Sequence, residues 1–391
     1  MKIVNFASYL LLSLLITGCT NTEKVVTAKP TNEIYLDQAF VSDHKIETEE
    51  QIFYVSKPMR RYIDQRLKTR SDTVTHKTSR LISDLFDPNY LDIHYAHDAN
   101  LTAAETFEQG VANCLSLTLL SYVLVQEADL EAAFVDVTLT ENWTVENGIS
   151  LANGHVNLLV YRVEKDNELR FSQRIVTIDF LPMLNVPVIK QRILDKKEIM
   201  SLFYNNKGAN ALIEGDTGKA YQYFKQATLL GPQMSSNWGN LASLYRQAGF
   251  LQQAEQLFDY ALYIDPDNLT IKENLAMLYR RTDRVELAEA LEKRVRKERS
   301  NNPYYYAMLA ALDYDKGQYR QAIRHYRKAI SMHNKEHQFL FGLAKSYTML
   351  NDYPRAKRYL LKAQAVAASH NDKQLYHSKL SALESMMAKN H

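Results

Sequence analysis

Small and aromatic residues return every 34 positions through the second half of the chain, separated by polar stretches. Within one unit they stand four and then three positions apart, as residues on one face of a helix do. The first two units carry Ala220, Phe224, Ala227 and Pro232, which recur as Ala254, Phe258, Ala261 and Pro266. The register continues through Ala288, then Ala322, Tyr326 and Ala329, and finally Ala356, Leu360 and Ala363. A period of this length predicts stacked helical pairs.

A second small position recurs earlier in each unit, in three units followed by tyrosine. The small residues are Gly208, Ala242, Ala276, Ala310 and Ala344, and the tyrosines are Tyr245, Tyr279 and Tyr347. The arrangement resembles the tetratricopeptide repeat, in which small residues let two helices approach and a large residue fills the gap to the next unit. Five units span about 201–370, and the third is degenerate, with Glu292 and Val295 where Phe and Ala are expected. We expect a capping helix over 374–387.

The first half of the chain has a different pattern. Residues 48–67 and 74–86 predict two helices, the second ending before Pro88. Residues 114–127 are apolar on most faces, which predicts a central helix. Short runs at 133–139, 156–163 and 174–180 then predict strands. Helices followed by successive short strands indicate an α+β domain with an antiparallel sheet, ahead of the all-α solenoid of repeats.

Composition narrows the class of protein. The 391 residues include only 12 Gly and 9 Pro, against a usual share of roughly 12% for the two together, which favours long helices. The formal net charge of +2 is too balanced to indicate a nucleic-acid partner or a polybasic membrane patch. The sequence has neither a Gly-rich phosphate loop nor a Walker motif, and we expect no cofactor and no metal ion.

The N-terminus has the features of an export signal. Lys2 precedes an apolar run at 9–16 that is too short to span a membrane. Residues 15–19 (LITGC) resemble the bacterial lipobox, which implies removal of 1–18 and lipidation of Cys19. Because Thr20 and not Asp follows, the resemblance implies sorting to the outer membrane, facing the periplasm. An ordinary signal peptide is the alternative. We expect 19–45 to hold the lipidated N-terminus and a flexible tether.

The cysteine count adds a constraint. The chain has two cysteines, so lipidation of Cys19 leaves Cys114 without an intramolecular partner in an exported, disulfide-forming compartment. Such a thiol is a liability unless it is used or deeply buried. Asn113, a favoured cap residue, puts Cys114 at a helix start, where the dipole and unpaired N–H groups stabilise a thiolate.

Two further residues complete a candidate catalytic set. His155 opens the strand-like run at 156–163, and Asp179 lies in the run at 174–180. A thiolate attacks an amide carbonyl, an imidazole moves protons, and a carboxylate holds the imidazole tautomer. Alone, each of the two residues would more often be structural. Their joint occurrence behind the one thiol left unlipidated favours a triad.

Residues 110–117 (GVANCLSL), with the two segments just described, resemble the bacterial transglutaminase-like, papain-like cysteine superfamily, including members fused to tetratricopeptide repeats. The resemblance covers about 50–195. It implies that Cys114 is the nucleophile, His155 the base and Asp179 the orienting acid. We therefore assign 46–195 to a cysteine enzyme domain and 196–391 to the repeats with their cap.

One departure from the family affects the oxyanion hole. The family often has Gly directly before the Asn-Cys pair, whereas two residues separate Gly110 from it here. The loop before the helix is therefore expected to be remodelled. The Cys114 amide should supply one oxyanion donor, and Gln109 or Asn113 a second.

Three other features have a weaker claim to function. The segment at 92–98 holds two His and two Asp, but nothing completes a metal site and a polar edge segment is favoured. Trp143 is expected either to close over a substrate or to pack. The basic run at 280–299 predicts a solvated helix face more than a binding patch.

The tetratricopeptide resemblance also implies a concave groove, lined by the second, fifth, ninth and twelfth positions of each unit. These sites include Asn205, Arg246, Arg280, Tyr304, Tyr314, Phe341 and Lys345, with Glu273 as the acidic member. Cations and aromatic rings suit an extended peptide that carries carboxylates. Packing of the enzyme domain or the terminal helix into the groove is the alternative.

The sequence therefore predicts a lipid-anchored cysteine enzyme of the bacterial cell envelope, acting on amide bonds of a peptide or protein that the repeats help to bind. Transfer of the acyl group to water would make it a peptidase, and transfer to an amine a crosslinking enzyme. The rival is a membrane-anchored tetratricopeptide adaptor whose enzyme-like domain only binds. Intact Cys114, His155 and Asp179 argue against the rival.

Overall fold

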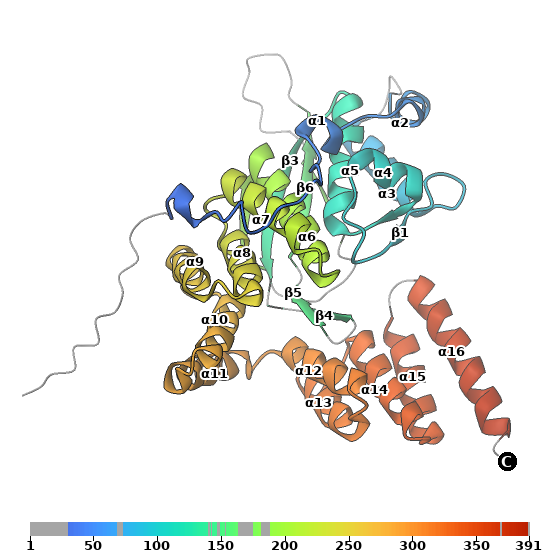
Figure 1. Ribbon diagram of the computed structural model, residues 1–391. Helices are drawn as coiled ribbons and strands as arrows, with labels where there is room; N and C mark the ends of the chain where they lie inside the picture. The colour runs from blue at the N-terminus through green and yellow to red at the C-terminus, as the bar shows by residue number, and fades with distance from the viewer. Residues whose placement is uncertain are drawn as a thin grey trace, which may run out of the picture.

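The computed structural model describes residues 30–68, 73–139, 141, 143–146, 149–152, 154–162, 175–180, 188–367 and 370–389. The signal peptide expected at 1–18, the lipidation site Cys19 and the first part of the expected tether lie outside these residues. An α+β unit is followed by a curved array of helices (Figure 1). In the described part of the chain, no helix is both long and apolar enough to cross a membrane.

The first helices differ in part from the prediction. The helix expected at 48–67 is interrupted, because α1 (Glu49–Ile52) ends at Phe53 and α2 (Lys57–Tyr62) runs on into a π-helical segment (Ile63–Leu67). Pro58 in the first turn of α2 explains the break, since proline begins a helix readily but cannot continue one. α3 (Val74–Phe86) has the predicted bounds.

A short helix and a pair of short strands precede the central helix. β1 (His94–Tyr95) pairs in parallel with β2 (Val111–Ala112), and α4 (Ala103–Gln109) lies between them in sequence. The prediction lacks α4, although Thr102 and Glu105 form a capping box and Gly110 ends the helix at φ 65°. α5 (Cys114–Glu127) follows and is buried along most of its length, as its apolar pattern predicts.

α5 packs against an antiparallel four-stranded sheet in the order β7-β6-β3-β8. The strands are β3 (Glu131–Leu139), β6 (Val156–Tyr161), β7 (Val176–Ile178) and β8 (Val188–Leu194). β6 and β7 fall within predicted runs, whose residues 163 and 174 are outside the described part. β3 begins two residues before its predicted run, and β8 is not in the prediction. A hairpin of β4 (Trp143–Glu146) and β5 (Ile149–Ala152) stands apart from the sheet between β3 and β6 in sequence.

The helical array consists of stacked antiparallel pairs. They are α6 (Lys196–Ile213) with α7 (Thr217–Leu230), α8 (Ser235–Ala248) with α9 (Leu251–Ile264), α10 (Leu269–Arg281) with α11 (Val285–Arg299), α12 (Pro303–Asp315) with α13 (Tyr319–Met332), and α14 (His337–Met349) with α15 (Tyr353–Val366). These pairs correspond to the five units of the sequence repeat, and α16 (His370–Lys389) includes the expected cap. Gly208 shows why small residues recur, because a Cβ there would stand 2.6 Å from the Phe224 ring.

The α+β unit and the first repeat share one core. Leu124 of α5 and Leu158 of β6 are fully buried in the same cluster as Ile199 and Phe203 of α6. The architecture therefore changes at the boundary expected between 195 and 196, but the hydrophobic core continues across it.

The expected tether is partly wrong. Residues 31–47, called the strap below, lie along the first repeat (Figure 1). Ile34 and Phe40 are buried, and the Phe40 ring stacks on Tyr221 and Tyr245 at centroid distances of 4.8 and 5.6 Å. These two apolar side chains hold the strap on the repeat, although the polar composition of the stretch before them suggested a free linker.

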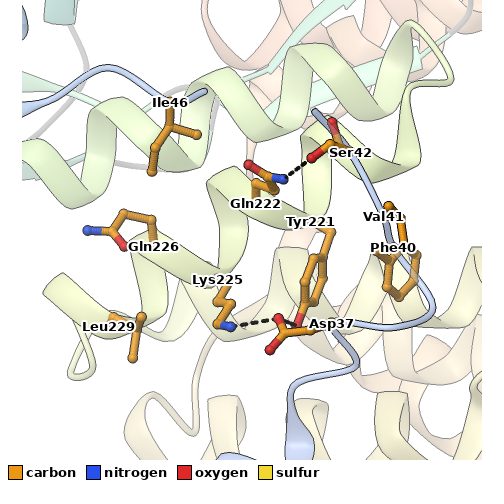
Figure 2. A pocket seen from close by; sticks show the side chains of 10 residues that line it. All are labelled: Asp37, Phe40, Val41, Ser42, Ile46, Tyr221, Gln222, Lys225, Gln226 and Leu229. Atoms are coloured by element: carbon orange, nitrogen blue, oxygen red, sulfur yellow. Dashed lines mark hydrogen bonds and ion pairs between the residues drawn. The ribbon is translucent and has the colours of Figure 1, made fainter. Parts of the chain in front are cut away.

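A hollow of about 440 Å³ lies between the strap and α7. Figure 2 shows Lys225 reaching Asp37, at 2.6 Å, and Gln222 donating to the Ser42 carbonyl at 2.8 Å. Most of the polar side chains around the hollow thus bond to one another, and we assign the hollow no ligand.

Candidate active site

Local hydrogen bonds hold Cys114 at the first position of α5. The Asn113 side chain caps the helix by accepting from the Ser116 N–H at 2.9 Å. The Asn113 amide donates to Asn100 at 2.5 Å, and the Ser116 hydroxyl donates to the Ala99 carbonyl at 2.7 Å. The helix start therefore rests on the loop after β1, and Cys114 is only 8% exposed.

The three residues predicted to act together lie side by side. The Cys114 Sγ is 3.5 Å from Nδ1 of His155, and Nε2 of the same ring is 2.9 Å from Oδ1 of Asp179. His155 precedes β6 and Asp179 follows β7, and the antiparallel pairing of these strands brings the two residues together. The imidazole is buried, whereas the carboxylate is 48% exposed. The catalytic role of the three stays a prediction.

The surroundings of His155 favour its protonated form. Burial lowers the pKa of His155, but its hydrogen bonds with Asp179 and Cys114 outweigh burial and raise the pKa to about 9. At neutral pH the ring is therefore an imidazolium between a thiol and a carboxylate. An adjacent imidazolium stabilises a thiolate, which is the nucleophilic form of cysteine.

Asn157 belongs to the site, although the sequence prediction omits it. Its Nδ2 donates to Oδ2 of Asp179 at 3.3 Å, so His155 and Asn157 each engage one oxygen of the carboxylate. The two residues stand two positions apart along one extended segment and therefore face the same side. A polar side chain two positions beyond the histidine is the sequence signal that could have found it.

The two side chains expected as a second oxyanion donor fit that role poorly. Asn113 is buried, and its amide donates to the side chain of Asn100 and the carbonyl of His97. Asn113 cannot serve as the second oxyanion donor, because its side-chain amide is already used to hold the start of α5. Gln109 lies on the last turn of α4 with an exposed side chain.

Tyr95 is a residue near the thiol that the prediction does not include. The pairing of β1 with β2 sets Tyr95 opposite Ala112, two residues before Cys114. Although Tyr95 is 44% exposed, partial desolvation of its hydroxyl and the proximity of Cys114 raise its pKa to about 12, so the phenol keeps its proton at neutral pH. The ring packs edge-on against His97, with centroids 4.9 Å apart.

The histidines and aspartates at 92–98 form no metal cluster. His94 lies 3.7 Å from Asp92 at the surface. Across the described residues, no group of three or more His, Cys, Asp or Glu is arranged to hold a metal ion.

The residues predicted to line a peptide groove do not share one open surface. Asn205 and Tyr304 are buried: Asn205 accepts from Asn240 at 2.9 Å, and Tyr304 packs edge-on against Phe339 at 5.3 Å. Their assignment to an open groove is wrong, because neighbouring repeat helices pack over them.

The two arginines of the predicted groove are also engaged. Burial lowers the pKa of Arg246, whose guanidinium contacts Asn274 at 3.4 Å. Arg280 forms a two-bond ion pair with Glu292 at 2.6 and 2.7 Å. Glu292, which looked like a degenerate repeat position in the sequence, is therefore the partner of a groove arginine.

The last repeat keeps part of the predicted surface. The Lys345 ammonium lies 4.7 Å from the Tyr314 ring centroid and 5.7 Å from that of Phe341. Tyr376 of α16 packs on Phe341 at 5.0 Å. The terminal helix thus covers one side of these groove residues, as the alternative expects.

The basic run at 280–299 is only partly a solvated face. Arg296 is 64% exposed, whereas the Arg299 side chain is 1% exposed. Trp143 packs with Tyr305 of α12 at 6.2 Å, in the packing role that the sequence left open. The β4–β5 hairpin therefore occupies the face of the array around α12.

Comparisons with known proteins identify the helical array. A model of the tetratricopeptide repeat family matches residues 245–312 and 314–383. The C-terminal region is therefore a tetratricopeptide array, and such repeats suggest interaction with another protein. No curated protein matches the chain in sequence.

Solved structures give weak matches over the repeats. MamA 41-end from Desulfovibrio magneticus RS-1 is 17% identical, with 44% of this chain and 96% of that chain covered and a TM-score of 0.25. PilF of Pseudomonas aeruginosa is 13% identical, with 50% and 94% covered and a TM-score of 0.27. YrrB, described as a tetratricopeptide protein with an unusual peptide-binding site, is 14% identical, with 47% and 93% covered and a TM-score of 0.25.

Proposed function

We propose that this chain is a lipid-anchored cysteine enzyme of the bacterial cell envelope that transfers the acyl group of a peptide or protein amide. The observation that carries the proposal is the arrangement of three side chains around the start of α5. The Cys114 Sγ lies 3.5 Å from Nδ1 of His155, and Nε2 of the same ring lies 2.9 Å from Oδ1 of Asp179. The resemblance of these segments to the transglutaminase-like superfamily supports it. The tetratricopeptide repeats then engage the substrate or a partner protein.

The first half of the reaction forms a thioester. The Cys114 thiolate attacks the amide carbonyl carbon, a C–S bond forms, and the carbonyl oxygen takes the charge. The Cys114 N–H at the start of α5 donates to that oxygen. The His155 imidazolium then gives its Nδ1 proton to the amide nitrogen, the C–N bond breaks, and the amine leaves.

The second half of the reaction cleaves the thioester and regenerates the thiolate of Cys114 and the imidazolium of His155. Neutral His155 takes a proton from water or an incoming amine, which attacks the thioester carbon. The C–S bond breaks, restoring thiolate and imidazolium. Asp179 pairs its charge with the imidazolium of His155, at 2.9 Å from Nε2, and keeps Nδ1 directed at the sulfur, while Asn157 holds Asp179.

Labelling of Cys114 tests the proposal in a chain that carries Cys19→Ser, which leaves one thiol. We expect rapid alkylation by iodoacetamide at pH 6 to 7, abolished by Cys114→Ala and slowed by His155→Ala. A rate equal to that of free cysteine and unchanged by His155→Ala would overturn the proposal. A labelled peptide library with and without an added amine then separates hydrolysis from crosslinking.

The outer-membrane location is part of the proposal, and its support is the lipobox resemblance of residues 15–19. An anchor on Cys19 joins the membrane to the strap through the short stretch before residue 30. The strap packs on the first repeat, so the anchor would hold the array near the membrane surface.

A non-catalytic tetratricopeptide adaptor is the second candidate, favoured by the family match at 245–312 and 314–383. If the chain is an adaptor, the Cys114 thiol should be alkylated slowly, and wild type and Cys114→Ala should capture the same partner proteins. Trapping of a thioester-linked substrate on Cys114 would exclude it.

A further inference from the structure

Arg299, the last residue of α11, is the centre of a contact between the repeats and the segment that enters the β4–β5 hairpin. Its guanidinium donates to the Glu141 carboxylate at 2.9 and 3.2 Å and to Glu273 of α10 at 2.7 Å. The same group lies 4.8 Å from the centroid of the Trp143 ring. Glu141 and Trp143 come from the α+β unit, so one arginine joins the two parts of the molecule.

The guanidinium at the centre of the Arg299 cluster is buried, whereas its two carboxylate partners are partly exposed. The Arg299 side chain is 1% exposed, and its charge is balanced by two carboxylates and a ring face. Asn302 adds a hydrogen bond from its amide to the Glu141 carbonyl at 2.6 Å. Removing a carboxylate partner would be costly, because the buried guanidinium of Arg299 would then lose part of its charge balance.

The hairpin held by Arg299 lies just before His155 in the sequence. Trp143 pairs with Ala152 across the hairpin, and Ala152 precedes His155 by three residues. On the other side, the His155 carbonyl accepts from the Val137 N–H at 2.9 Å. His155 thus sits between a segment fixed by the sheet and a segment fixed by the repeats.

We propose that Arg299 is a positioning residue for His155, acting through the β4–β5 hairpin. The inference rests on the proposed function, because it assigns Arg299 a part in the same reaction. The face of the array around α12 then binds the chain's own β4–β5 hairpin. The repeats therefore support the catalytic site as well as binding a partner protein.

The test measures the pH dependence of Cys114 alkylation by iodoacetamide, from pH 5 to 9, in the full chain carrying Cys19→Ser. His155→Ala defines the profile of an unassisted thiol, which reacts only as the pH approaches about 8.5. We expect Arg299→Met to move the profile toward that of His155→Ala, with alkylation at pH 6 about tenfold slower than in the parent chain. Arg299→Lys keeps the charge and should recover part of the rate.

A matched control separates positioning from general loss of stability. Arg284 forms a two-bond pair with Glu255, at 2.8 Å twice, and lies over the Tyr279 ring at 4.3 Å, all within the repeats. Arg284→Met removes a cluster with the same kinds of partner, although a more exposed one, that does not touch the hairpin, and we expect the parent profile. Glu141→Gln is a milder change from the hairpin side, useful if Arg299→Met fails to fold, and should shift the profile in the same direction.

The outcomes distinguish the two proposals. If the alkylation profile shifted with His155→Ala but with neither Arg299→Met nor Glu141→Gln, the role of Arg299 would be overturned. The proposed function would then still stand. An equal shift with Arg284→Met would also overturn it, because the effect would then be general destabilisation. No response to His155→Ala would defeat the proposed function and this inference together.

Discussion

The two ring nitrogens of His155 have different partners, and this asymmetry governs the site at the scale of single residues. Nδ1 faces the thiol and Nε2 faces Asp179, whose second oxygen accepts from Asn157. One carboxylate thus connects two side chains from the start of β6. Substitutions at these positions are expected to act through it.

The pH dependence of stability follows from the raised pKa of His155. The folded value is about 9 and the ordinary value 6.5, so protonation stabilises the fold. The contribution is complete below pH 6.5 and is lost as the pH rises through 9. Comparing Tm for wild type and His155→Gln between pH 6 and pH 10, we expect the wild-type advantage to shrink with rising pH. An advantage that grew with pH would contradict the assignment.

Loss of either group that supports the ring should weaken activity without abolishing it. Asp179→Asn and Asn157→Val each leave the thiol and the imidazole in place, so each should lower kcat/KM while leaving measurable turnover. Because both act through one carboxylate, the double variant should lose little more than Asp179→Asn alone. Losses that multiply would show that Asn157 acts by another route.

At the scale of elements, single side chains decide where segments begin and what they pack against. Pro58 divides the first predicted helix, and the Asn113 cap places Cys114 at the start of α5. Phe40 holds the strap by stacking on Tyr221 of the first repeat and Tyr245 of the second. The first two effects are local signals, whereas the third depends on a partner far along the chain.

Removing the Phe40 ring should release the strap. Truncating a buried phenylalanine to alanine costs about 3–5 kcal/mol of stability. A short surface segment cannot lose that much free energy of docking and stay in place. Limited proteolysis should cut Phe40→Ala within 31–47 much faster than wild type. Val41→Ala, at a neighbouring residue that is 80% exposed, is the control and should behave like wild type. Equal cleavage of all three proteins would mean that the strap is held by other contacts.

At the scale of the whole molecule, the chain is an α+β unit and a tetratricopeptide array, and two of the contacts between them in the described residues are extensive. α6 shares the core of the α+β unit, and the Arg299 cluster joins the hairpin to the third repeat and its neighbour α12. The array is therefore supported by the domain at both contacts. Several predicted groove residues are instead buried or paired within the array itself, by side chains of neighbouring repeat helices.

The anchor should be separable from the fold. Cys19→Ser is expected to move the protein from the membrane fraction to the soluble fraction, because the lipobox is the one membrane attachment that the sequence predicts. The thermal unfolding midpoint should not change, since the packed strap begins well beyond Cys19. Membrane retention of the variant without acylation would contradict the lipoprotein assignment.

The sequence by itself determined the features that repeat or that depend on neighbours in the chain. The 34-residue period predicts the helical pairs, because each pair is built from local contacts and the same small residues recur at each close approach. The residue types of Cys114, His155 and Asp179, with the cap before the cysteine, predict a site that the strand pairing then brings together. These inferences need only spacing and side-chain chemistry.

Only the tertiary structure decided which distant residues meet. Arg299 and Glu141 are 158 positions apart, and nothing in their local sequence distinguishes this pair from the Arg280–Glu292 pair within one repeat. The docked strap and the second support of Asp179 by Asn157 likewise need three-dimensional contacts. The physical reason is that ion pairs and packing depend on the distance between atoms, which the order of residues does not specify for positions so far apart.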